Sequence, residues 1–304
     1  MKAARRWWQR LSGNIRGALL VVVAALGFTT MGVCVKSVDR LSVWELVALR
    51  SLVGLMFMAP ALYRAGRMVF VTQRFHAHLL RSGLGMAGMV CFFLTITHVE
   101  LTLATALGFS RVLFVTILAV LLLGEVVRWR RTLATVVGFL GVLICIQPGA
   151  ESFNPWAVVG VLAALFGAGV TTAVKRLTDT EAPLTIVLWT YVLMGAMATL
   201  PALYTWLTPT PVELALIALM GASSALAQTC TVMALKVGEA SAVTPFDYTR
   251  LPWAALLGFY VFGELPTLHT WLGAAVIMGS TLYIAMREAR LRAEARRRQR
   301  AGRS

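Results

Sequence analysis

The chain has 304 residues, of which 59% are hydrophobic and only 13% are charged, and its mean hydropathy is +0.77. These values exclude an ordinary soluble domain and are typical of a protein embedded in a lipid bilayer. The net charge of +15 does not indicate nucleic-acid binding, because the arginines gather at the chain ends and in short connections. The sequence lacks the aromatic-basic pattern of single-strand binders, so we expect no nucleic-acid partner.

The first 16 residues are basic, and they include the pair Trp7 and Trp8, which suits a membrane interface. A basic start before an apolar run is also typical of a cleaved signal peptide. No small-x-small cleavage site follows in a polar context, and the Ala-Ala-Leu of residues 24–26 recurs at 163–165. We therefore expect residues 1–16 to form a cytoplasmic N-terminus and the first apolar run to be retained.

Ten apolar runs approach the roughly 20 residues that a membrane-spanning helix needs. They cover residues 17–37, 43–63, 79–97, 102–123, 132–148, 156–175, 183–205, 213–235, 241–262 and 269–286. The connections are short, and none could hold a soluble domain. The expected fold class is an all-α integral membrane protein with ten transmembrane helices.

The two halves of the chain match at a constant offset of 139 residues. Thr105 corresponds to Thr244, Arg111 to Arg250, and the Gly-Glu pair at 124–125 to the pair at 263–264. This offset predicts two repeats of five helices, over 17–148 and 156–286. Because five is odd, the copies must be inserted in opposite directions, and inverted repeats are typical of transporters with a substrate site where the copies meet.

Positive charges alternate between successive loops. Arginines and lysines between the second and third, fourth and fifth, sixth and seventh, and eighth and ninth spans are Arg64, Arg67, Arg74, Arg81, Arg128, Arg130, Arg131, Lys175, Arg176 and Lys236. The alternate loops hold only Lys36 and Arg40. This asymmetry predicts cytoplasmic N- and C-termini. The basic tail, residues 287–304, is expected to be a short cytoplasmic helix or a disordered end that anchors to anionic lipid.

Arg111 and Arg250 are the leading candidates for a substrate site. Each lies near the middle of its span, where an arginine costs about 3 kcal/mol on insertion scales. Two interpretations stay open. The arginines either bind an anionic group of a substrate or tie neighbouring helices together.

Asp247 precedes Arg250 by three residues and therefore shares its helix face. It either neutralises Arg250, the interpretation we favour, or takes up a proton during transport. Pro245 and Pro252 bracket the pair and predict a kinked or broken ninth span, because proline removes a backbone donor. The first half has Ala106 and Leu113 at these positions, so the halves have diverged in chemistry.

Five further polar residues lie within apolar runs or at their ends. Arg50 lies a third of the way along the second span, and helix tying or snorkelling is at least as good an interpretation as substrate contact. Ser224 and Gln228 share one face of the eighth span, which suits either helix packing or the lining of a cavity. Glu125 and Glu264 follow helix ends, where a carboxylate opposes the helix dipole, so each is expected to find a cation or polar partner.

The sequence offers no support for catalytic or metal chemistry. Its four cysteines are far apart in apolar runs, without a CxxC or Cys/His spacing, and its histidines are expected in loops or at span ends, His76 and His78 in a basic loop. No GxSxG, HExxH, P-loop or GxGxxG motif occurs. We expect a protein that is not an enzyme and that binds no cofactor or metal.

Over residues 14–286 the chain resembles the EamA-type carriers of the drug/metabolite transporter superfamily. The resemblance rests on ATALGFSRVLFVTILAVLLLGE, WRRTLATVVGFLGVLI and FDYTRLPWAALLGFYVFGELPTLHTWLGAAVIMGSTLYI. It implies a secondary carrier of the bacterial inner membrane that moves amino acids, nucleotide-like cofactors, vitamins or opine-type metallophores. It also implies that Arg111, Asp247, Tyr248 and Arg250 lie close to the central cavity.

The sequence as a whole predicts a secondary transporter that exports a small polar metabolite, anionic or zwitterionic, by alternating access. Import of a vitamin or nucleotide-like metabolite is one alternative, and a membrane scaffold or sensor without transport is another. Small-residue helix faces serve internal packing and homodimers alike, so a homodimer stays open.

Overall fold

The computed structural model describes residues 11–123, 129–151, 153–177, 180–237 and 244–301, and these contain helices and no strand. The helices are α2 (Gly13–Ser37), α3 (Val43–Ala65), η1 (Arg67–Phe70), α4 (Phe75–His98), α5 (Leu101–Gly108), α6 (Arg111–Leu123), α7 (Trp129–Ile146), α8 (Trp156–Leu177), α9 (Pro183–Tyr204), α10 (Pro211–Val237), η2 (Thr244–Thr249), α12 (Arg250–Phe262) and α13 (Leu268–Ala301). Trp7, Trp8 and Glu125 lie outside the described residues.

The apolar runs form helices because a helix satisfies its own backbone groups, which lipid cannot do. Among the described residues, eight stretches are long and apolar enough to cross a membrane, and Thr132–Ile146 is a shorter apolar helix. All ten predicted spans fall on helices, with the fourth divided into α5 and α6 and the ninth into η2 and α12.

A break occurs at the same place in both halves, although only the second half carries prolines there. In the first half α5 ends in a tight turn, in which the N–H groups of Phe109 and Ser110 donate to Ala106 O and Leu107 O. The Ser110 hydroxyl also donates to Leu107 O, at 2.6 Å. In the second half η2 passes into α12 at Arg250, and Pro252 falls in the first turn of α12, where a missing N–H costs nothing.

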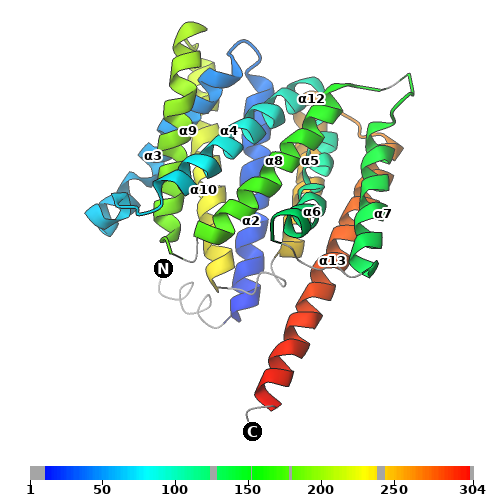
Figure 1. Ribbon diagram of the computed structural model, residues 1–304. Coiled ribbons are helices and arrows are strands. Elements are labelled where there is room, and N and C mark those ends of the chain that lie inside the picture. The colour runs from blue at the N-terminus through cyan, green and yellow to red at the C-terminus, as the bar shows by residue number, and fades with distance from the viewer. Residues whose placement is uncertain (1–10, 124–128, 152, 178–179, 238–243, 302–304) are drawn as a thin grey trace.

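The two halves interlock, because the most extensive helix contacts join one half to the other. α2 of the first half packs on α10 of the second, and their counterparts in the opposite halves, α8 and α4, pack on each other in the same way. In addition, α7 packs on α13, and α3 packs on α9. α2 begins at the end of the bundle from which α13 projects, whereas α8 begins at the opposite end (Figure 1). The pairing and the opposed directions are those of two inverted repeats.

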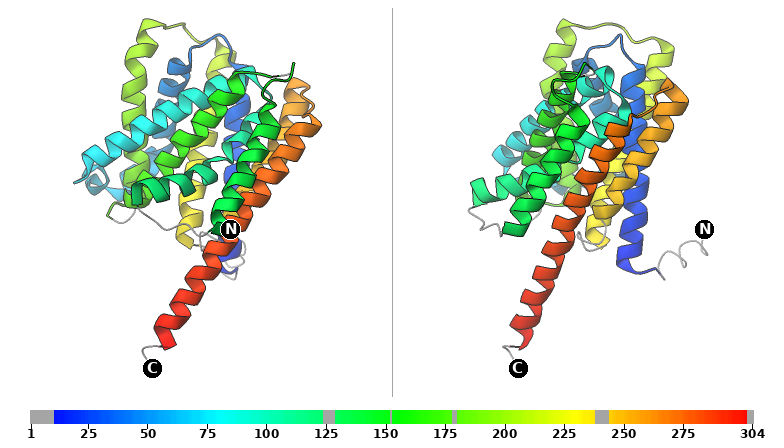
Figure 2. Two further views of the ribbon diagram at one scale, coloured as in Figure 1. Left: turned by 45° about the vertical axis from the view of Figure 1, so that its right-hand side comes forward. Right: turned by 90° about the vertical axis from the view of Figure 1, so that its right-hand side faces the viewer.

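The fifth and tenth spans approach closely through glycines. A Cβ on Gly273 of α13 would collide with Cys145 Sγ and lie 2.6 Å from Gly141 O of α7. These helices therefore meet backbone to backbone, in the way that small residues favour between membrane helices. Beyond the bundle α13 continues as one helix to Ala301 (Figure 2), so the described part of the basic tail is helical.

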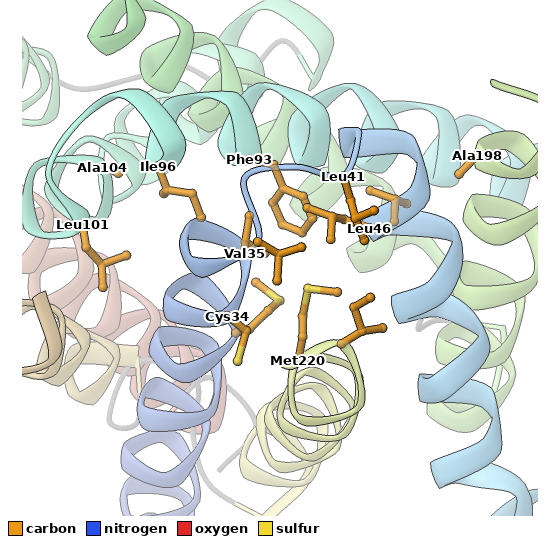
Figure 3. Close-up of a cluster of buried hydrophobic side chains, with 14 of the residues drawn as sticks. Cys34, Val35, Leu41, Leu46, Phe93, Ile96, Leu101, Ala104, Ala198 and Met220 are labelled. Carbon is orange, nitrogen blue, oxygen red and sulfur yellow. The ribbon is translucent and has the colours of Figure 1, made fainter. Parts of the chain in front are cut away.

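The larger apolar core fills the end of the bundle at which α2 finishes, which we call the Lys36 end. Side chains of α2, α3, α4 and α10 converge there, with Val35, Leu46, Phe93 and Met220 among the most buried (Figure 3). Cys34 lies in the same cluster, 2% exposed, and acts as a small apolar side chain. This core fills the Lys36 end, and the breaks in the fourth and ninth spans lie below it.

Candidate functional site

Asp247 lies between Arg111 and Arg250 and contacts both. Arg250 Nη2 donates to Asp247 Oδ1 at 2.8 Å, and Arg111 Nη2 lies 3.8 Å from Asp247 Oδ2. We call these three residues the Asp247 triad. Two guanidinium groups and one carboxylate leave the triad with one positive charge. The helix starts beside it add positive dipole ends, so the site favours a further negative group.

The breaks in the two spans determine where the triad lies. Arg111 is the first residue of α6 and Arg250 the first residue of α12, while Asp247 belongs to η2. Arg111 follows the start of α5 by ten residues, eight in α5 and two in the turn, and α12 ends at Phe262, twelve residues after Arg250. At 1.5 Å per residue both arginines lie roughly 15–20 Å below the Lys36 end, near the middle of a bilayer of about 30 Å.

The triad is accessible on the Arg111 side. The Arg111 side chain is 44% exposed, compared with 23% for Asp247 and 24% for Arg250. The stem of Arg111 packs against α8, because a Cβ on Gly167 would lie 3.1 Å from its Cδ. Arg250 is held more firmly, because its guanidinium stacks 4.7 Å from the Phe28 ring and makes the shorter bond to Asp247.

Aromatic rings line the triad. Phe109, in the turn between α5 and α6, packs edge-to-face on Tyr248 of η2 with ring centroids 5.0 Å apart. The Tyr248 hydroxyl is hydrogen-bonded to Thr281 of α13. Phe28 and Tyr248, both partly exposed, place flat apolar surfaces next to the charges, so the site suits a ligand that has both a planar ring and a charged group.

Arg50 and Ser224 form a second group, away from the triad. Arg50 Nη1 donates to Ser224 Oγ at 2.7 Å, and Ser224 Oγ lies 3.0 Å from the Tyr191 hydroxyl. Gln228 lies one turn beyond Ser224 on α10, half-buried. Among the described residues no hydrogen bond or ion pair joins this group to the triad. Glu45, near Arg50 in sequence, instead accepts bonds from the N–H groups of Ser42 and Leu207.

The structure corrects two expectations about the third span. Arg81 and His78 were expected in a basic loop, but α4 begins at Phe75 and buries both, with Arg81 7% and His78 0% exposed. The helix starts about one turn before the apolar run, so sequence hydropathy alone placed the boundary too late. Tyr191 and Trp189 of α9 were not expected near Arg50 and His78, and only the packing of α9 on α3 and α4 brings them there.

Charged residues close the Lys36 end across the two halves. Lys36 pairs with Glu264 of the second half and donates to Val99 O at 2.6 Å. The other oxygen of Glu264 accepts from the Leu101 N–H at 2.8 Å. The prediction of a partner for Glu264 is therefore confirmed. Arg40 and Glu213 add a more exposed pair at the same end, with atoms 2.7 Å apart.

An apolar groove of about 400 Å³ lies between α3 and α9, away from the triad. Leu52, Leu55, Val192 and Leu203 line it, and no charged side chain does. Its few polar side chains are those of Ser51, Tyr191, Thr199 and Trp206, so the groove is mostly apolar and suits lipid chains. Among the described residues no group of three or more His, Cys, Asp or Glu could hold a metal ion.

A helical bundle of interlocked halves, with charged groups where broken spans meet, defines a multi-pass membrane transporter rather than an enzyme. The chain belongs to the EamA-like transporter family, whose sequence model matches it twice, over residues 15–147 and 154–286. The expected family and fold class are thereby confirmed, and the chain is a membrane-embedded transporter for a small molecule.

Several relatives are similar over most of their length. The chain is 32% identical to an S-adenosylmethionine uptake transporter of Rickettsia bellii, over 82% of this chain and 86% of the relative. It is 33% identical to a riboflavin transporter of Brucella anthropi, over 76% of this chain and 84% of the relative. It is 27% identical to the pseudopaline exporter CntI of Pseudomonas aeruginosa, over 86% of this chain and 93% of the relative.

One solved crystal structure superposes with a TM-score of 0.64, covering 90% of this chain and 97% of its own. Its sequence is 17% identical, so the likeness concerns the fold alone.

Proposed function

We propose that the chain is a secondary carrier that binds a small polar metabolite, anionic or zwitterionic, at the Asp247 triad and moves it by alternating access. The observation that carries the proposal is the position of Asp247 between one arginine from each half. A group that links the two repeats near mid-membrane can couple ligand binding to their relative movement.

Arg111 is the arginine that meets the cargo first. It is more exposed than Arg250, and its 3.8 Å contact with Asp247 is too long for a hydrogen bond. A carboxylate or phosphate can therefore replace Asp247 at Arg111 with a shorter, charge-assisted bond. This exchange loosens the link between α6 and η2 while Asp247 stays bonded to Arg250, and a cationic group of a zwitterion then has Asp247 as its partner.

The cargo class that fits best joins a flat ring to a charged or polar tail. Phe28 and Tyr248 supply the ring surfaces beside the triad, and the buried Phe109 supports Tyr248 from behind. S-adenosylmethionine joins a purine nucleoside, through a sulfonium cation, to an amino-acid zwitterion, and riboflavin joins a fused-ring system to an uncharged polyhydroxyl chain. The S-adenosylmethionine uptake transporter supports uptake of a nucleoside-like metabolite, and the riboflavin transporter supports a vitamin-like cargo. Export of an opine-type metallophore is the second candidate, and the similarity to the pseudopaline exporter favours it.

The Lys36 end is proposed to be the outer, closed end. Arg64, Arg67 and Arg74 and the helical tail lie at the opposite end, so that end belongs in the cytoplasm, and the membrane is the bacterial inner membrane. The proposed units are residues 1–16, the repeats 17–148 and 156–286, and the tail 287–304. The sequence contains no ATP-binding motif, so the proposed drive is a proton or substrate gradient.

Flux into proteoliposomes tests the proposal. Purified protein is reconstituted, and entry of labelled S-adenosylmethionine, riboflavin and an opine-type chelator is measured with and without a proton gradient. We expect saturable, cargo-specific flux that Arg111→Ala abolishes and Arg130→Ala, at an exposed position in the first turn of α7, retains. Flux of none of these classes through well-folded protein would contradict the proposed cargo class.

A further inference from the structure

Buried polar atoms without partners gather where α3, α4 and α9 meet. Among the described residues, the buried side-chain atoms that lack a hydrogen bond include Nε of Arg50 and Arg81, both ring nitrogens of His78, and Nε1 of Trp189. Buried polar groups in proteins are nearly always hydrogen-bonded, so a local cluster of unpaired buried polar atoms needs an explanation. Most of these atoms are donors, which indicates a missing acceptor.

Arg50 and Arg81 are two buried cations without an acidic partner. Arg50 is 2% exposed and Arg81 7% exposed. No carboxylate in the described part of the chain lies within 4.0 Å of either guanidinium, and their charges repel each other. An uncompensated buried charge is strongly destabilising, and two of equal sign are worse. The Asp247 triad, by contrast, carries its own carboxylate.

The surroundings hold Arg50 in a fixed orientation with one edge free. Its Nη1 donates to Ser224 Oγ, and its guanidinium lies 5.3 Å from the centre of the Tyr191 ring. Tyr191 can approach because Gly54 leaves room, since a Cβ there would lie 2.7 Å from the ring. Nε of Arg50 stays unpaired, and a guanidinium edge with a free Nε is the geometry that binds two oxygens of one anion.

Glu181 limits where an anion can lie in this cluster. Its Oε1 is 3.9 Å from His78 Nε2 and accepts a bond from the Thr72 hydroxyl at 2.7 Å. A second anion beside His78 would be repelled by this carboxylate. The positions next to Arg50 and Arg81 have no such neighbour within ion-pair distance among the described residues.

We propose that Arg50 and Arg81 together bind an anionic group with at least two oxygens, a carboxylate or a phosphate, at a site separate from the Asp247 triad. Two sources share this chemistry: the charged end of the cargo, and a free inorganic anion. Assignment to the cargo rests on the proposed function, whereas binding of the anion itself does not.

Thermal unfolding of the full-length protein in detergent tests the site, with inorganic phosphate, acetate and chloride compared at equal ionic strength. We expect a saturable rise in the unfolding temperature with phosphate or acetate beyond that seen with chloride. Arg81→Gln should unfold at a higher temperature than the wild type without anion, because it removes a buried repulsion, and should lose the saturable rise. Arg64→Gln, at an exposed position on α3, is the matched control and should behave as the wild type.

Arg81→Lys keeps the positive charge but loses the planar donor pair, so its apparent affinity for phosphate should fall at least tenfold. Equal effects of all three anions on the wild type would overturn the proposal, as would wild-type phosphate affinity in both Arg81 variants. Competition between phosphate and a transported cargo assigns the site to the cargo, and independent binding assigns it to a free anion. Because phosphate is tested without cargo, failure of the transport proposal would not by itself affect this result.

Discussion

Arg111 and Arg250 lie 139 residues apart, yet each is the first residue of the second helical part of a broken span, and both contact Asp247. The duplication supplies two arginines and the second half supplies the one carboxylate. The pseudo-symmetric scaffold thus carries an asymmetric charge arrangement, with Arg250 firmly bonded and Arg111 free to exchange partners.

Asp247→Asn should tighten binding of an anionic cargo and slow its turnover. Without the carboxylate both arginines are available to the ligand, and nothing competes for Arg111 when the ligand must leave. We expect the apparent dissociation constant to fall severalfold and the maximal flux to fall tenfold or more, measured by equilibrium binding and proteoliposome flux. Asp39→Asn, in an exposed loop, should change neither. Weaker binding in Asp247→Asn would argue that the aspartate itself holds the cargo.

Glu264→Gln should open the Lys36 end. The substitution leaves the Lys36 ammonium, only 16% exposed, without its counter-ion, and weakens the acceptor of the Leu101 N–H. Breaking a buried pair typically costs about 3 kcal/mol of unfolding free energy. Cys34, two residues from Lys36 and 2% exposed, reports the opening, because its labelling by a maleimide should become faster. Unchanged labelling, equal to that of the exposed control Glu151→Gln, would show that the pair does not close this end.

Glu100→Gln should stabilise the protein at neutral pH. Burial raises the pKa of the Glu100 carboxyl above its ordinary value of 4.5, and repulsion from Glu264 adds to the rise, while Lys36 opposes it. The folded protein therefore holds this proton at pH values at which the unfolded chain has lost it. Unfolding free energy consequently falls as pH rises through the window above 4.5.

Thermal unfolding measured between pH 4.5 and 8 checks this predicted fall of stability with rising pH. Glu100→Gln should unfold at a higher temperature than the wild type at pH 7, and the difference should shrink towards pH 4.5. A variant that is less stable at pH 7 would mean that the ionised carboxylate makes a favourable contact there.

Gly273→Ala should destabilise the contact between α7 and α13. The added methyl group would collide with Cys145 and approach the Gly141 carbonyl, and backbone atoms cannot give way as a flexible side chain can. Overpacking of this kind typically costs about 1–3 kcal/mol. Gly279→Ala, on the same helix, has no atom within 4 Å of the new methyl group and should unfold like the wild type. Equal unfolding temperatures for the two variants would contradict the close approach.

The class of protein, the membrane spans and the duplication could be predicted from the sequence. They depend on composition, on the lengths of apolar runs and on a repeat, all of which can be read directly along the chain. A constant offset placed Arg111 and Arg250 at equivalent positions, and the three-residue spacing between Asp247 and Arg250 predicted that these two side chains share one face. The break in the fourth span was not predictable in this way, because it uses a serine hydroxyl and two backbone bonds instead of proline.

The cluster that contains Arg50 and Arg81 could not be predicted from the sequence, for a different reason. Arg81 reads as one more loop arginine, and its burial follows from the packing of α4 against α9. The pairing of Arg111 with Asp247 likewise depends on how the halves interlock, which no spacing along the chain reveals.

The central claim is that cargo binds between Arg111 and Arg250, and ligand-induced stabilisation tests it most directly. A cargo at a hundredfold its dissociation constant should raise the unfolding free energy of the wild type by about 2.7 kcal/mol. We expect Arg111→Ala and Arg250→Ala to fold with normal yield and to lose this stabilisation, while Arg130→Ala keeps it. Full stabilisation by the cargo in both triad variants would contradict the account and place the binding site elsewhere in the bundle.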